Sequence, residues 1–68
     1  MNLIKLDYNE VSNLKNKVGN IEDFKITHKT GPASRLDLFK DIDSDNKDLY
    51  VANKDGSSPE FTGETLYN

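Results

Sequence analysis

The sequence predicts an α+β domain in which one N-terminal helix packs on an antiparallel meander of three or four strands. Three observations predict it: apolar residues at helical spacing near the N-terminus, alternating apolar and polar residues in several later runs, and turn-forming sequences between those runs. The 68 residues predict a single small domain, residues 1–68. A chain of this length buries only about 60% of its unfolded surface, so its core is small.

The helix is predicted over residues 8–18, after a short strand or extended arm at residues 2–6. Asp7 or Asn9 can cap its first turn, and Gly19 ends it because glycine readily adopts the left-handed conformation that follows a helix. The apolar residues that share one face of this helix are Tyr8, Val11, Leu14 and Val18.

The remaining sequence predicts the strands of the meander. In the first run Phe24, Ile26 and His28 alternate with polar residues, which places them on one face of a strand. The turn sequences Thr-Gly-Pro and Lys-Asp-Gly-Ser-Ser-Pro separate later runs. The alternating runs are residues 21–29, 34–40, 49–53 and 60–67, the last interrupted by a glycine.

The polar stretch between the second and third runs contains Asp41, Asp43 and Asp45, which resembles the opening of a calcium loop. The remainder of that motif is missing, since Asp48 stands where an apolar residue belongs and Ala52 stands where a bidentate glutamate belongs. Aspartate, asparagine and serine are also the residues that favour tight turns. We therefore predict a hairpin turn here rather than a calcium site.

Composition limits the classes of function. The chain has no cysteine and one histidine, so we expect no disulfide, no metal site and no cofactor. No apolar run approaches 18 residues, so no membrane partner is expected. The net charge is −3, and the basic residues concentrate in the first forty positions. A surface for anions must therefore lie near Lys25, Lys29 and Arg35.

The only histidine and the only arginine, His28 and Arg35, lie seven residues apart across a Gly-Pro turn, with Lys29, Thr30 and Ser34 between them. A metal-independent ribonuclease needs groups that move protons and a cation that stabilises charge on the phosphate. Imidazole exchanges protons near neutral pH, and guanidinium donates two parallel hydrogen bonds to a phosphate. These residues supply the required groups.

A structural interpretation competes with this chemical one. His28 is in phase with Phe24 and Ile26, which is also typical of a hydrogen-bonded core histidine. Arg35 can pair with Asp37 or with an acid on a neighbouring strand. Thr62 precedes a glycine, as a turn residue often does.

Several motifs resemble those of the C-terminal toxin domains of bacterial polymorphic toxin and contact-dependent inhibition systems. The resemblance covers roughly residues 11–68. The matching positions are Val11, Leu14 and Lys15; Leu36 to Phe39 with Asp41; Leu49 to Val51; and Pro59, Phe61, Thr62 and Gly63. Two features depart from the pattern: Ser-Asp-Asn-Lys replaces the usual glycine of the hairpin turn, and the Lys-Gly-Gly run before the last turn is absent.

The resemblance implies a ribonuclease fold of the barnase, EndoU, colicin and RelE type, with a helix packed on a curved sheet. It implies catalytic roles for His28, Arg35 and Thr62. Residues expected to bind substrate are Lys25, Lys29 and Ser34.

The function expected from the sequence is a metal-independent toxin ribonuclease that cleaves RNA in the cytoplasm of a competitor bacterium, after delivery from a producer cell. Its partners would be RNA and a cognate immunity protein. The alternative is a non-enzymatic acidic module, such as an inhibitor, an immunity-like protein or a phage accessory protein. In that case the acidic stretch 41–55 would bind a basic partner.

Overall fold

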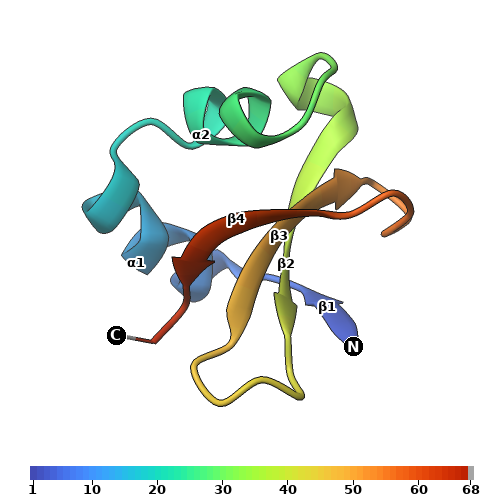
Figure 1. Cartoon of the computed structure of the whole chain (residues 1–68). Helices are drawn as coiled ribbons and strands as arrows, with labels where there is room; N and C mark the ends of the chain where they lie inside the picture. The colour runs from blue at the N-terminus through green and yellow to red at the C-terminus, as the bar shows by residue number, and fades with distance from the viewer. Residues whose placement is uncertain (68) are drawn as a thin grey trace.

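A computed structural model describes residues 1–67 and shows two helices packed on one face of a four-stranded antiparallel sheet (Figure 1). The strands lie in the order β1-β2-β3-β4, so each is hydrogen-bonded to its neighbours in sequence. The elements are β1 (Leu3–Lys5), α1 (Tyr8–Val18), α2 (Ile21–His28), the 3-10 turn η1 (Ala33–Arg35), β2 (Leu36–Asp41), β3 (Asp48–Asn53) and β4 (Glu60–Thr65).

The predicted α+β class and the antiparallel sheet are confirmed, and the predicted number of helices is wrong. The short N-terminal run forms β1, where Leu3 pairs with Asp41 and Lys5 pairs with Phe39. This strand completes the sheet at the edge where a strand at residues 21–29 was expected. No helix within residues 1–67 is long and apolar enough to cross a membrane.

α1 begins and ends where the sequence predicts. Asp7 accepts a hydrogen bond from the Glu10 amide at 2.8 Å, and Glu10 accepts one from the Asp7 amide at 3.0 Å, which is a capping box. The Glu10 carboxylate also pairs with Lys40 on β2. One acidic side chain therefore both caps the helix and ties it to the sheet.

The run 21–29, predicted as a strand, instead forms the helix α2 over Ile21–His28, with Lys29 as the residue after it. Asn20 caps its first turn by accepting a hydrogen bond from the Asp23 amide at 2.9 Å, and acidic residues occupy that turn. Ile21 and Phe24 pack on the core, while Ile26 is 49% exposed. The three-residue spacing of Ile21 and Phe24 indicates a helix, and the two-residue alternation of Phe24, Ile26 and His28 does not reflect the structure.

The core lies between the helices and the sheet. Its buried cluster joins one leucine of α1 to apolar residues of β2, β3 and the segment before α1: Leu6, Leu14, Leu36, Leu38, Leu49 and Val51. Partly buried side chains that pack around this cluster are Val11, Val18, Ile21, Phe24 and Leu66. Two short helices can be stable here only through this burial.

The hairpin turn predicted between β2 and β3 is present. Asp41 is buried, and its carboxylate accepts hydrogen bonds from the backbone amides of Asn2 and Asp43. The Ser44 hydroxyl donates to the Asp41 carbonyl oxygen and accepts from the Asp48 amide. The Asp41 carboxylate is therefore held by amides of this loop and of the N-terminal segment. Within residues 1–67 no three potential ligands converge on a metal position.

Candidate functional site

A hollow of about 460 Å³ lies between η1 and the loop that joins β3 to β4. Its lining residues are Ser34, Arg35, Asn53, Lys54, Asp55 and Ser57. We call it the Arg35 hollow. Leu36 pairs with Asn53 in the β2–β3 ladder, so the antiparallel register brings the residues just beyond that pair, Arg35 and Lys54, to the same end of the ladder. Two cations thereby line one hollow, although they lie nineteen positions apart in sequence.

The loop beside this hollow is fixed by its own hydrogen bonds. The Gly56 amide donates to the Asn53 carbonyl oxygen at 2.8 Å, and the Asn53 amide donates to the Ser57 carbonyl oxygen at 3.0 Å. Gly56 has φ of 87°, a left-handed conformation that suits glycine. The Asp55 carboxylate accepts from both the amide and the hydroxyl of Ser57. Asp55, the acidic residue that lines the hollow, is therefore held by hydrogen bonds within the loop.

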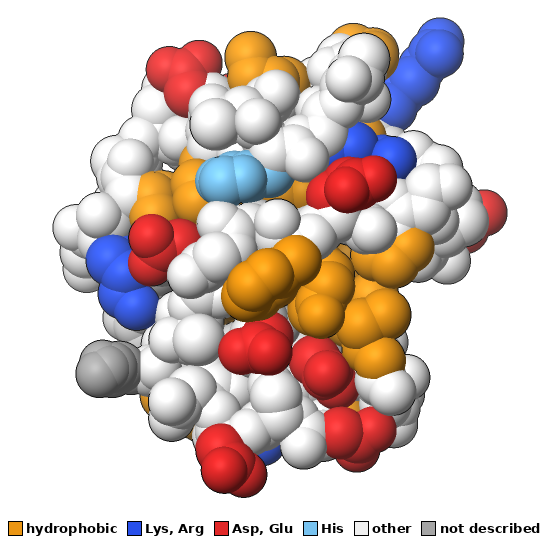
Figure 2. All heavy atoms as spheres, viewed as in Figure 1, with side chains coloured by type: hydrophobic (Ala, Val, Ile, Leu, Met, Phe, Trp, Pro, Cys, Tyr) orange, Lys and Arg blue, Asp and Glu red, His pale blue; other side chains and the backbone are white. Residues whose placement is uncertain are grey.

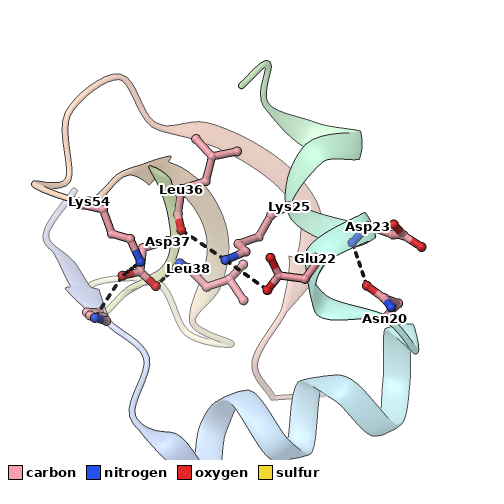
Figure 3. Close-up of polar contacts among 9 residues, drawn as sticks. Asn20, Glu22, Asp23, Lys25, Leu36, Asp37, Leu38 and Lys54 are labelled. Carbon is pink, nitrogen blue, oxygen red and sulfur yellow. Dashed lines mark hydrogen bonds and ion pairs between the residues drawn. The ribbon is translucent and has the colours of Figure 1, made fainter. Parts of the chain in front are cut away.

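The two cations of the hollow differ in their partners. Arg35 is exposed, and no ion pair or side-chain hydrogen bond engages its guanidinium within residues 1–67. Lys54 lies 3.5 Å from Oδ2 of Asp37, which is also 3.0 Å from Nζ of Lys5 (Figure 3). The arginine is thus available to a ligand, and the lysine, which lines the same hollow, pairs with a carboxylate.

Asp37 is the most constrained acid near the hollow. Its Oδ1 accepts from the Leu38 amide at 3.1 Å, whereas its buried Oδ2 makes no well-aligned hydrogen bond and faces the two ammonium groups. Burial raises the pKa of Asp37. The Lys5 ammonium, the Leu38 amide and the charge of Lys54 outweigh burial and hold this pKa below its usual value of 3.8.

His28 lies in the last turn of α2, next to η1, and does not line the Arg35 hollow. Its ring meets the Phe24 ring edge-on, with centroids 4.8 Å apart. The imidazole has no hydrogen bond or ion pair within residues 1–67, and Figure 2 shows it at the surface between apolar side chains. His28 therefore resembles a core histidine in packing on an aromatic ring, and a catalytic histidine in reaching solvent.

Lys25 lies in the interior, where its Nζ donates to the Leu36 carbonyl oxygen at 3.2 Å and lies 3.6 Å from Oε1 of Glu22 (Figure 3). The residue is only 8% exposed. These contacts fasten α2 to the start of β2. Lys29 is half-buried just after the helix, where its amide donates to the Lys25 carbonyl oxygen.

Thr62 is also buried, at 8% exposed. Its hydroxyl donates to the Leu49 carbonyl oxygen at 2.8 Å and accepts from the Glu64 amide at 3.1 Å. The β3–β4 pairing shifts register at this point, between Asp48 and Tyr50. The hydroxyl therefore satisfies backbone groups at an irregularity of the sheet.

Of the predicted site residues, the structure brings Ser34 and Arg35 together in one hollow. It does not bring His28, Lys25, Lys29 or Thr62 into that hollow. Lys54 is not among the site residues that the sequence predicts. A signal for it existed, because two predicted strands that pair about the turn at residues 41–48 place Arg35 and Lys54 at the same end of the hairpin.

A second surface feature lies on the sheet at β3 and β4. The Tyr50 and Phe61 rings lie 5.4 Å apart, and Phe61 is 53% exposed. Acidic side chains gather in the lower half of Figure 2, toward the β2–β3 turn, beside a group of apolar side chains. This face is as acidic as the sequence predicts for the second half of the chain.

No protein-family model, no curated protein and no solved structure matches this chain. The resemblance to toxin domains therefore stays a prediction.

Proposed function

We propose that this chain is a metal-independent endoribonuclease that acts as a toxin on RNA. One observation carries the proposal: α2, which ends at the half-buried His28, contacts η1, which carries the exposed Arg35. The two residue types that such a reaction needs therefore lie on adjoining elements. The proposal also implies delivery into the cytoplasm of a competitor bacterium and a cognate immunity protein that covers the site.

The reaction is attack of a 2′-hydroxyl on the adjacent phosphorus. The O2′–P bond forms, the P–O5′ bond breaks, and one proton leaves the 2′-oxygen while another reaches the 5′-oxygen. His28 serves as the base or the acid, since imidazole exchanges protons at neutral pH. Arg35 donates to the phosphate oxygens, where charge grows in the transition state.

The test is RNA degradation by the purified chain in the presence of EDTA. We expect the wild type to degrade RNA, and His28→Ala and Arg35→Ala each to lower the rate by about a hundredfold or more. Lys15→Ala is the matched control, because it removes one exposed cation of α1, outside the Arg35 hollow. Intact RNA at high protein concentration would end the proposal.

The acidic binding module is a second candidate. It is favoured by the Tyr50–Phe61 pair, in which Phe61 is 53% exposed and follows the acidic Glu60 directly in sequence. An aromatic pair with an acidic surround suits a basic protein partner. Expression in bacteria separates the two candidates. The ribonuclease predicts growth arrest that His28→Ala relieves. The binding module predicts normal growth and a single basic partner whose binding Phe61→Ser abolishes.

A further inference from the structure

We infer that the Arg35 hollow binds a phosphodiester of single-stranded RNA, with Arg35 and Lys54 as its cationic contacts and Ser34 as a hydrogen-bond donor. The choice of RNA as the polymer rests on the proposed function. The binding of a phosphate group rests on the hollow alone. Lys54 is thereby assigned to substrate binding, a role that neither the motifs nor the sequence spacing gave it.

The contents of the hollow favour an anion. Its neutral and acidic groups already have partners within the loop: the Asn53 side-chain amide donates to the Ser57 hydroxyl, and that hydroxyl donates to the Asp55 carboxylate. The groups that can meet a ligand are the Arg35 guanidinium, the Ser34 hydroxyl and the Lys54 ammonium, which also pairs with Asp37. The lining carries these two cations against the single carboxylate of Asp55, so its charge favours an anion. A planar guanidinium with an ammonium beside it is a typical phosphate-binding pair.

The hollow is also preorganised. Arg35 lies in η1, whose turn is closed by a hydrogen bond from the Arg35 amide to the Pro32 carbonyl oxygen at 2.9 Å. Lys54 follows directly on β3, whose last residue, Asn53, pairs with Leu36 on β2. Both cations therefore lie on backbone that is already ordered, so the binding of a phosphate does not carry the entropic cost of ordering the loop.

The hollow has room for more than one phosphate. Its volume of about 460 Å³ lies in the lower part of the roughly 300–1,000 Å³ range of small-molecule sites, so a phosphate and the adjoining part of a longer strand can enter it. η1 also contacts α2. A strand whose scissile phosphate lies at Arg35 can therefore also contact His28 on α2, which inorganic phosphate cannot do. We expect an oligonucleotide to bind more tightly than inorganic phosphate for this reason.

The experiment is an NMR titration of ¹⁵N-labelled full chain with two probes. The first probe is inorganic phosphate. The second is a single-stranded oligoribonucleotide with 2′-O-methyl groups, which binds but cannot be cleaved through its 2′-oxygens. Binding is then read without any dependence on catalysis.

We expect amide shifts at residues 34–36 and 53–57 with both probes, and at least tenfold tighter binding of the oligonucleotide. Arg35→Ala should weaken oligonucleotide binding about tenfold or more, and Lys54→Ala about fivefold. Lys54→Ala should also reduce the slope of log K against log salt by about 0.7, the loss of one phosphate contact to a single strand. Lys15→Ala should change binding less than twofold.

Three results would overturn the inference. They are no shifts in the hollow at millimolar probe, binding of inorganic phosphate without tighter binding of the oligonucleotide, or equal weakening by Lys15→Ala and Lys54→Ala. Tight oligonucleotide binding in the hollow together with intact unmodified RNA would refute the proposed catalysis and leave this site standing.

Discussion

Lys54 Nζ lies 3.5 Å from the buried Oδ2 of Asp37, so a carboxylate competes with any anion for this cation of the Arg35 hollow. The Asp37 side chain is 16% exposed, whereas that of Lys54 is 56% exposed. The carboxylate is therefore fixed and the ammonium can turn toward a ligand.

Asp37→Asn should strengthen phosphate binding, because it removes the negative charge that opposes the ligand while keeping the shape of the side chain. We expect about threefold tighter binding at low salt, and a smaller gain at high salt. Isothermal titration with the uncleavable oligonucleotide measures it. Asp45→Asn, an equal change of charge in the distant hairpin turn, is the control. Weaker binding by Asp37→Asn would show that Asp37 serves mainly to place Lys54.

Acid should destabilise the chain through its structural aspartates. The pKa of Asp37 is lowered on folding. So are the pKa values of Asp41, through the Asn2 amide, and of Asp55, through the Ser57 hydroxyl. A carboxyl with a lowered pKa stabilises the fold above its unfolded value of 3.8 and loses that contribution as pH falls through the folded value.

Urea unfolding at several pH values measures this effect. We expect a nearly constant free energy of unfolding from pH 7 to about 5 and a decline below about 4. Asp37→Asn should flatten part of that decline, and Asp45→Asn should leave it as it is. An acid decline of unchanged size in Asp37→Asn would contradict the electrostatic role assigned to Asp37.

Lys25→Ala should act on stability. The change removes the ammonium that donates to the Leu36 carbonyl oxygen, together with a buried stem, so we expect a loss of about 1–3 kcal/mol in unfolding free energy. Lys29→Ala, four residues further on and half-buried, should change it by less than about 0.5 kcal/mol. Urea midpoints report both. A stable Lys25→Ala protein that no longer binds RNA would restore Lys25 as a substrate contact.

Thr62→Val should loosen the β3–β4 pairing, since its hydroxyl bridges the Leu49 carbonyl oxygen and the Glu64 amide. We expect a cost of about 1–2 kcal/mol, which Thr62→Ser should largely avoid because it keeps the hydroxyl. Thermal unfolding and RNA cleavage are measured on the same samples. Cleavage lost in a fully folded Thr62→Val protein would instead support the catalytic role implied by the toxin resemblance.

Much of the fold could be predicted because local signals and packing agree. Asp7 caps the start of α1 and Gly19 caps its end, as the sequence predicts. The alternation around Leu36 and Leu38 predicts a strand, and both leucines are buried in β2. The prediction of a strand at residues 21–29 was wrong because Phe24, Ile26 and His28 also fit the two-residue period of a strand. The Asn20 cap and the acidic first turn were the signals that outweighed that alternation.

The candidate site was predictable only in part. Ser34 and Arg35 are adjacent in sequence and lie in the same short turn, η1, so any correct prediction of that turn places them together. Lys54 required knowledge of which strands pair, and that register is set by the length of the β2–β3 turn. The interior places of Lys25 and Thr62 depend on carbonyl groups distant in sequence, Leu36 and Leu49, which no local pattern reveals.

The most direct test of the account is cleavage, in EDTA, of two oligonucleotides of identical base sequence, one entirely ribose and the other entirely 2′-deoxy. We expect the wild-type chain to cut only the ribose strand, to leave ends that carry the phosphate on the 3′ side, and to lose this activity in His28→Ala. An intact ribose strand, equal cutting of both strands, or full activity of His28→Ala would contradict the proposal that His28 and Arg35 form a ribonuclease site.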